Sequence, residues 1–402
     1  MALELEIAPK EKMVRAAHAP SVSSLAAGYW GVMKKGVIEL EAEEALYLID
    51  IRNASVRDKA QNAWSFNEVA ECLERPKLMA RYLTFKDWRD RGLIARPAAE
   101  NAGDYTRSIV KKYPEGKFQK PGFGVSARFY ADDLFAVIDD DQTAKALYEH
   151  AWFGQWATYK AEQRGRLGKL DIYETLFLMK HGGLKLQNAT EKDVLKLALA
   201  RRPDFQSLLE VYEDWRMQGF VLKTGFKFGT HFRIYFPGAA PGGGEKWMHS
   251  QHVLHVFPRA SQLLISEWAR AIRVAHSVRK TFVLAIPGQK KKGKKEEKNK
   301  AHASGSHAAS LSSLDFLLFH RKGTDIENPK TGFPRYLMLS LSEEEMLGGE
   351  QLARAIEACK LSGLELMVAI ADRETSVTYY AVHRLEIPGS DYEYYEIEWV
   401  QP

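Results

Sequence analysis

Three side chains of different chemistry lie at the ends of predicted elements in the middle of the chain. Tyr235 ends an alternating strand over residues 230–235, and His249 opens a second strand after a glycine-rich loop. Lys280 lies between a predicted helix and an apolar strand over residues 281–286. Antiparallel pairing across the loop would bring Tyr235 and His249 together. Functional residues are common at the ends of elements.

A phenol, an imidazole and an ammonium group can together cleave RNA through its own 2′-hydroxyl. The imidazole can protonate the leaving 5′-oxygen because its pKa lies near neutral pH. The ammonium group can stabilise the negative charge that develops on the phosphate. A phenol, with an ordinary pKa of about 10, is a poor base. It needs a neighbouring cation that lowers its pKa or orients it, and the reaction requires no metal ion.

Each of these residues also has a purely structural interpretation. A tyrosine at a strand end usually packs against the core, and His252 and His255 compete with His249 as the reactive imidazole. By strand alternation His249 and His255 share one face, whereas His252 lies on the other. The three-residue spacing of these histidines fits neither a helix face nor one strand face, so a zinc site is not favoured. The glycines of residues 241–246 lack the ending of a phosphate-binding loop.

The composition is that of an ordinary globular protein. The 402 residues, 45% hydrophobic and 27% charged, predict about two to four domains. No apolar run approaches the roughly 20 residues that span a bilayer, and the acidic start is not a secretory signal. With only Cys72 and Cys359, neither a disulfide framework nor a cysteine zinc site is expected, so we predict a cytoplasmic protein without membrane contact.

Internal repeats set the predicted domain order. Residues 28–31 and 85–92 have counterparts in 151–154 and 212–219, which indicates two copies of a helical unit. In each copy the longest helix ends at a glycine, which tolerates a left-handed cap. A strand-rich unit is also repeated, because residues 266–286 match 350–370 at an offset of 84. The last copy has Leu364 in place of Lys280 and no histidine matching His249, as expected of a scaffold.

We therefore predict a mixed α/β (α+β) fold of repeated units, each with a helical N-terminal subdomain or a mixed-sheet C-terminal subdomain flanked by helices. Residues 289–308 hold seven lysines and two glutamates, account for the net charge of +5, and predict a disordered linker. A weak role of this linker in attracting RNA stays open. The predicted order is a non-catalytic unit 1–132, a complete catalytic unit 133–288, the linker 289–308 and a structural unit 309–402.

Three segments, residues 222–235, 249–256 and 271–284, resemble the catalytic blocks of the archaeal tRNA-splicing (tRNA-intron) endonuclease family, in order. The resemblance implies that Tyr235 is the base, His249 the acid and Lys280 the charge stabiliser. It implies metal-independent cleavage of bulge-helix-bulge sites in precursor tRNA, giving 2′,3′-cyclic phosphate and 5′-hydroxyl ends without a cofactor. Arg273 matches an arginine that clamps a bulged base in the family.

The repeat order resembles the form of this family with three units per chain. That form works as a homodimer, since one complete catalytic unit supplies one site and two cuts are needed. In relatives an acidic loop of a scaffold unit docks into a catalytic unit. Asp372 and Glu374 are the matching acids here, in a loop less acidic than is usual in the family.

The second helical copy carries a basic insertion that the first lacks. The interval from its glycine to its glutamate, Gly154 to Glu174, is seven residues longer than the one in the first copy. We hypothesise that this loop reaches the RNA backbone and widens the range of accepted bulges; a solvated surface insertion is the alternative. The candidate contacts are Lys160, Arg164 and Arg166.

Two other functions stay open from the residues alone. A non-catalytic RNA-binding scaffold would tolerate loss of Lys280. A metal-dependent nuclease would need clustered carboxylates, and activity in excess chelator distinguishes it from a site built on Tyr235, His249 and Lys280.

Overall fold

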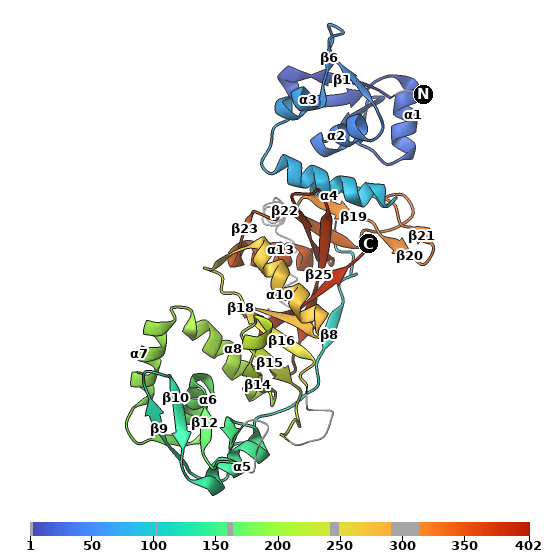
Figure 1. Ribbon diagram of the computed structural model, residues 1–402. Helices are drawn as coiled ribbons and strands as arrows, with labels where there is room; N and C mark the ends of the chain where they lie inside the picture. The colour runs from blue at the N-terminus through green and yellow to red at the C-terminus, as the bar shows by residue number, and fades with distance from the viewer. Residues whose placement is uncertain (1–2, 102, 159–163, 242–248, 291–312) are drawn as a thin grey trace.

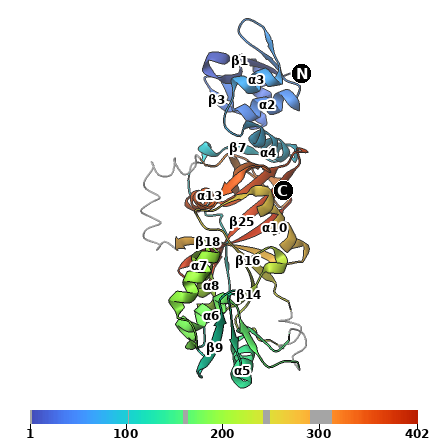
Figure 2. The ribbon, with the colours of Figure 1, turned by 60° about the vertical axis from the view of Figure 1, so that its left-hand side comes forward.

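The computed structural model describes residues 3–402 apart from 102, 159–163, 242–248 and 291–312. The molecule is elongated, with the two helical units at opposite ends and the two strand-rich units between them (Figures 1 and 2). The predicted mixed α/β architecture of repeated units is confirmed. Most of the predicted linker lies outside the described residues, and strand β18 (Thr281–Lys290) extends two residues into it. Every helix in the described part of the chain is too short or too polar to span a membrane.

The first helical unit contains a sheet as well as helices, with strand order β3-β4-β2-β1-β5-β6. Its helices are α1 (Ala19–Ala27), α2 (Ala42–Asp50), α3 (Phe66–Cys72) and α4 (Leu78–Asp90). Its strands are β1 (Glu4–Ala8), β2 (Met13–Ala16), β3 (Val32–Lys34), β4 (Val37–Leu40), β5 (Ser55–Arg57) and β6 (Ala63–Trp64).

The second helical unit repeats this arrangement, with strand order β11-β12-β10-β9-β13. Its helices are α5 (Asp141–Ala151), α6 (Ile172–Phe177), α7 (Glu191–Arg201) and α8 (Phe205–Met217). Its strands are β9 (Val125–Tyr130), β10 (Phe135–Ile138), β11 (Gln155–Trp156), β12 (Gly168–Leu170) and β13 (Leu184–Leu186). The boundary predicted at residue 132 is corrected, because β9 pairs with β10 and belongs to this unit.

One large sheet runs through both strand-rich units, in the order β14-β15-β16-β18-β26-β25-β24-β22-β19-β7, with β8 (Val110–Lys112) beside β25. The strands of the first strand-rich unit, which is predicted to be catalytic, are β14 (Val221–Thr224), β15 (Phe232–Tyr235), β16 (His252–Val256) and β18. The others are β7 (Ala95–Pro97), β19 (Phe316–Leu318), β22 (Tyr336–Ser342), β24 (Glu365–Ala371), β25 (Val377–Glu386) and β26 (Tyr392–Val400).

The repeat at an offset of 84 residues is confirmed in three dimensions. Helix α10 (Ile265–Ser277) and helix α13 (Gly349–Leu361) have the same length, and their bounds differ by that offset. The short strands before them, β17 (Gln262–Leu264) and β23 (Met346–Gly348), pair with each other. A small hairpin, β20 (Arg321–Lys322) and β21 (Asp325–Ile326), follows β19. The two strand-rich units therefore face each other as near-equivalent halves.

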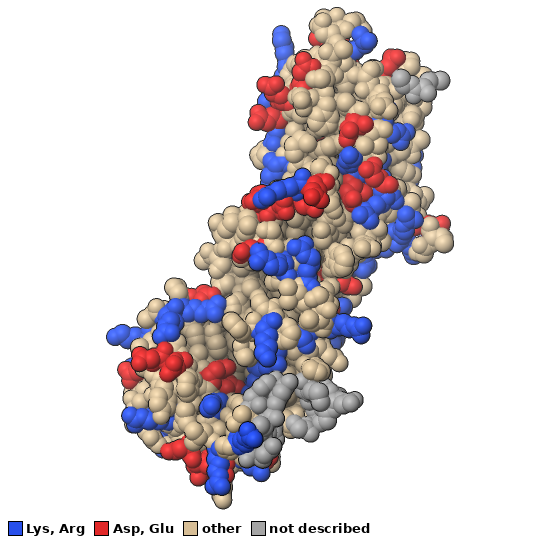
Figure 3. All heavy atoms as spheres, viewed as in Figure 1, with Lys and Arg blue, Asp and Glu red and all other residues tan. Residues whose placement is uncertain are grey.

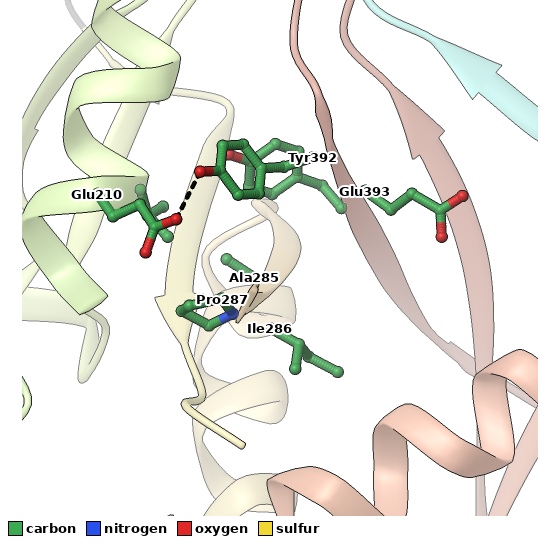
Figure 4. Close-up of a pocket in the computed structure, with 8 residues that line it drawn as sticks. Glu210, Ala285, Ile286, Pro287, Tyr392 and Glu393 are labelled. Carbon is green, nitrogen blue, oxygen red and sulfur yellow. Dashed lines mark hydrogen bonds between the residues drawn. The ribbon is translucent and has the colours of Figure 1, made fainter. Parts of the chain in front are cut away.

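The last strand of the chain joins these halves. The alternation of polar and apolar residues in β26 predicts an edge strand suited to pairing with another unit. In the structure β26 pairs with β18 of the other strand-rich unit. It is not an edge, because β25 lies on its other side. Tyr392 on β26 also donates a hydrogen bond to Glu210 on α8 (2.5 Å; Figure 4). The cavity beside this contact has a volume of about 10 Å³, enough for roughly one water molecule and no larger ligand.

The first helical unit packs on the last strand-rich unit. One apolar core combines residues 3–95 with residues 316–381, and a second combines residues 113–285 with residues 385–394. Trp88 on α4 is fully buried, and its ring lies 5.6 Å from that of Tyr379 on β25. The chain thus builds two composite units, and the one that holds the predicted catalytic residues is inserted between the two parts of the other.

Both composite units keep the same buried polar contact. Glu44 accepts a hydrogen bond from the N–H of Gly31 (2.9 Å) and pairs with Arg96 (3.0 Å). In the second copy Glu174 accepts a hydrogen bond from the N–H of Gly154, the equivalent glycine, and pairs with Lys223 (2.7 Å). A buried carboxylate needs such partners to avoid a large desolvation cost. The contact therefore stabilises the junction of a helical unit with a strand-rich unit.

His383 on β25 makes the stability of the last unit depend on pH. Its Nδ1 lies 2.9 Å from Glu365, and its Nε2 lies 3.1 Å from Glu398. Burial opposes the charged imidazole, but the hydrogen bond and charge of Glu365 outweigh it and raise the pKa of His383. A raised pKa in the folded state stabilises the protein below the unfolded pKa of about 6.5, and this stabilisation is lost as the pH rises through the folded pKa.

Replacing His383 by glutamine is therefore expected to lower the melting temperature more at about pH 6 than at about pH 9. The measurement is thermal unfolding of the variant and the wild type at both values. An equal loss at the two values would contradict a charged His383.

Candidate active site

The register of three neighbouring strands places Tyr235 and Lys280 at one end of the sheet. Ile234 on β15 pairs with His252 on β16, and His252 pairs with Thr281 on β18. The next position along puts Tyr235 and Lys280 on either side of the start of β16. Neighbouring strands are about 4.8 Å apart, so the two Cα atoms are roughly 10 Å apart. That separation allows both side chains to reach one phosphodiester.

Lys280 is held beside the loop that carries His249. Its Nζ donates to the carbonyl oxygen of Ser250 and lies 3.3 Å from the Ser250 Oγ. The ammonium group also lies 4.9 Å from the centre of the Phe228 ring. Burial lowers the pKa of Lys280, and the charge of Arg233 lowers it further. The lysine is thus a partly desolvated cation next to the predicted acid.

His249 does not open a strand, which corrects the prediction from the sequence. Strand β16 begins at His252, and His249 lies exposed in the preceding loop. The argument from strand alternation therefore does not apply to it. The following residue, Ser250, is buried and bonded to Lys280, so the backbone beside His249 is fixed while its ring faces solvent.

The two competing histidines are half-buried, and their lowered pKa values leave them uncharged at neutral pH. Burial lowers the pKa of His252 to about 4, and Lys280 adds to the effect. Burial likewise lowers the pKa of His255 to about 4, and its ring packs against that of His231 at 4.6 Å. A general acid must carry a proton, so neither ring suits that role. His249 is the imidazole of this segment whose side chain is exposed to solvent.

Tyr235 ends β15, as predicted, and is largely buried. Its ring lies 4.6 Å from that of Trp152, the residue that follows helix α5. Its hydroxyl accepts a hydrogen bond from Nη1 of Arg233 (3.4 Å). Arg233 was not singled out from the sequence. The signal was its position two residues before Tyr235, which puts both side chains on one face of the strand.

The predicted RNA-binding residues lie on different elements. Arg273 is exposed on α10, and its charge opposes the burial that raises the pKa of Tyr380 on β25. Arg164 and Arg166 are exposed, while Lys160 lies outside the described residues. Figure 3 shows Lys and Arg side chains over α10 and the nearby strands. The exposed basic residues of this region include Lys227, Arg270, Arg273 and Arg279.

The predicted assembly loop lies far from Tyr235 and Lys280 in the same chain. Asp372 and Glu374 are in the turn between β24 and β25, where Asp372 accepts from the N–H of Glu374 (2.9 Å). Across the sheet, Phe282 lies level with Leu366, and because β18 and β24 are antiparallel, Lys280 lies level with Val368. Asp372 is therefore about 13 Å from the level of Lys280 along the strand direction and three strands, about 14 Å, to the side, or roughly 20 Å away in all. At that distance the two carboxylates do not contact Tyr235 or Lys280 of their own chain.

Comparison with known proteins identifies the family. Residues 128–198 match the family described as tRNA intron endonuclease, N-terminal domain, and residues 205–296 match the catalytic C-terminal domain of the same family. A tRNA-splicing endonuclease from Thermococcus kodakarensis is 32% identical over 155 residues, which are 37% of this chain and 84% of that protein. The chain belongs to the tRNA-splicing endonuclease family. The enzyme class expected from the sequence is confirmed.

Two further relatives are similar to this chain over longer stretches, which extend beyond the residues matched by the two family domains. A tRNA-splicing endonuclease from Methanococcoides burtonii is 26% identical over 324 residues, 64% of this chain and 89% of that protein. One from Methanosarcina mazei is 24% identical over 326 residues, with 64% and 88% covered. The match to the catalytic domain contains Tyr235, His249 and Lys280, and the match to the N-terminal domain covers most of the second helical unit.

Proposed function

We propose that this endonuclease excises introns from precursor tRNA by metal-independent cleavage at bulge-helix-bulge sites. The products are a 2′,3′-cyclic phosphate and a 5′-hydroxyl. The observation that carries the proposal is the grouping of a phenol, an ammonium group and an exposed imidazole at one end of β15, β16 and β18. These are the groups that an attack by the 2′-hydroxyl requires.

In the proposed reaction Tyr235 takes the proton of the 2′-hydroxyl as the 2′-oxygen attacks phosphorus. The bond from phosphorus to the 5′-oxygen breaks, and His249 gives that oxygen a proton. Lys280 stabilises the negative charge on the non-bridging oxygens. Because Lys280 also holds Ser250, it positions the loop that carries His249. The exposed arginines around α10, Arg273 among them, bind the RNA backbone or the bulge.

We also propose a homodimer. One chain carries one complete catalytic unit, whereas removing an intron requires two cuts. Asp372 and Glu374 lie too far from their own active site to act there, so their proposed role is to dock on the catalytic unit of the second copy. Isologous pairing of this kind supplies two sites related by a twofold axis.

The test is incubation of the purified protein with a bulge-helix-bulge RNA in excess chelator. We expect cleavage at both bulges at an unchanged rate, a 5′-hydroxyl end that a polynucleotide kinase can phosphorylate, and a 3′-end that RNA ligase does not join until the cyclic phosphate is opened and the phosphate removed. A rate that falls to background in chelator and returns with a divalent cation would indicate the metal-dependent alternative.

A further inference from the structure

Arg233 donates a hydrogen bond to the Tyr235 hydroxyl, and the use of this phenol as a base is the weakest part of the proposed chemistry. We propose that Arg233 is a positioning residue that orients the Tyr235 hydroxyl and stabilises negative charge on its oxygen, which lets Tyr235 accept the proton of the 2′-hydroxyl. This inference rests on the proposed function. It supplies the neighbouring cation that a tyrosine base requires.

The contacts of Arg233 hold its guanidinium between the Thr224 carbonyl and the Tyr235 hydroxyl. Its Nε donates to the carbonyl oxygen of Thr224 on β14 (2.9 Å), which anchors one side of the group. Its Nη1 donates to the Tyr235 hydroxyl (3.4 Å) on the other side. Its charge also contributes to the lowered pKa of Lys280, so the two cations are close. A hydrogen bond from a cation to an oxygen strengthens as that oxygen becomes negative.

The second copy of the strand-rich unit, which lacks the reacting groups, distinguishes a role of Arg233 in the reaction from a role in stabilising the fold. The pair Phe232–Leu254 on β15 and β16 corresponds to Phe316–Met338 on β19 and β22, so register is kept at the 84-residue offset. At that offset Arg233 is replaced by Leu317. The positions of the phenol, imidazole and ammonium hold Phe319, Phe333 and Leu364.

Polar groups that only stabilise the fold are retained in both copies. Lys223, which pairs with Arg233 across β14 and β15, corresponds to Arg96 beside Leu317, and each binds its buried glutamate. A cation that was needed to hold the strand would be expected in both units. Arg233 is instead lost together with the three reacting groups, which assigns it to the chemistry.

The test compares Arg233→Gln with the wild type in single-turnover cleavage at neutral pH, with RNA affinity measured separately. We expect the rate to fall about tenfold or more while the dissociation constant stays within about twofold, since a tenfold change matches one unit in the phenol pKa. Arg354→Gln is the matched control, because Arg354 is an exposed helical arginine of the scaffold unit. It should cleave at the wild-type rate.

A second arm tests the reason for the loss. Placing 3,5-difluorotyrosine, a more acidic phenol, at position 235 of the Arg233→Gln protein should restore most of the rate. A wild-type rate in Arg233→Gln, or a loss that the acidic phenol does not restore, would overturn the proposal. Arg233→Lys keeps the positive charge but lacks the forked geometry of the guanidinium, so we expect a rate between those of the wild type and Arg233→Gln. This variant also keeps the proposal testable if Arg233→Gln folds poorly. If instead the wild type needs a metal ion, the proposed function fails, and that is seen before any variant is compared.

Discussion

Replacing His249 or Lys280 by alanine is expected to slow the cleavage of precursor tRNA by about a hundredfold or more, as is typical of acid–base and charge-stabilising groups. RNA affinity should change little, because neither side chain is needed for the wider basic surface. Lys280→Ala should have the larger effect. It removes the cation and also frees the Ser250 carbonyl that fixes the His249 loop. The measurement is single-turnover cleavage together with an equilibrium binding assay.

The double variant sharpens this prediction. Groups that act on one transition state are not additive, so the double variant should lose little more than the slower single variant. His18→Ala and Lys35→Ala, two exposed residues of the first helical unit, are matched controls and should leave the rate unchanged. A wild-type rate in either active-site variant would refute the assignment of that residue.

Replacing Trp88 by alanine is expected to lower the free energy of unfolding by about 3–5 kcal/mol, the usual cost of deleting a fully buried aromatic ring. The same loss is expected for Trp215→Ala, its counterpart in the second helical unit. Trp88 packs on Tyr379 and Trp215 packs on Tyr394 at 5.0 Å. Each tryptophan therefore joins a helical unit to strands of the last unit.

Chemical denaturation measures these losses, and Trp399→Ala is the control of matched residue type. Trp399 is 46% exposed on β26, so its loss should cost about 1 kcal/mol or less. If Trp88→Ala unfolded the first helical unit in a separate transition, the composite core of residues 3–95 and 316–381 would not be a single cooperative unit.

The amino-acid sequence determined the repeats, the mixed fold class and the family, because these depend on local patterns. Alternation predicted the strand that ends at Tyr235, and the offset of 84 residues predicted the equivalence of α10 and α13. The residue types at Tyr235, His249 and Lys280 defined a possible chemistry. All of these are readable within a few tens of residues.

Tertiary structure alone decided how the units combine. The packing of the first helical unit on the last strand-rich unit, and the position of β26 inside the sheet, depend on contacts between residues hundreds of positions apart. Helical patterning also concealed the small sheets, whose strands are mostly three to five residues long. His249 lies in a loop because strand pairing begins three residues later. The spacing of Arg233 and Tyr235 puts both on one face of the strand, but only the tertiary structure shows the hydrogen bond between them. Periodicity describes which face a side chain takes, whereas register and docking are fixed by the partner across the sheet.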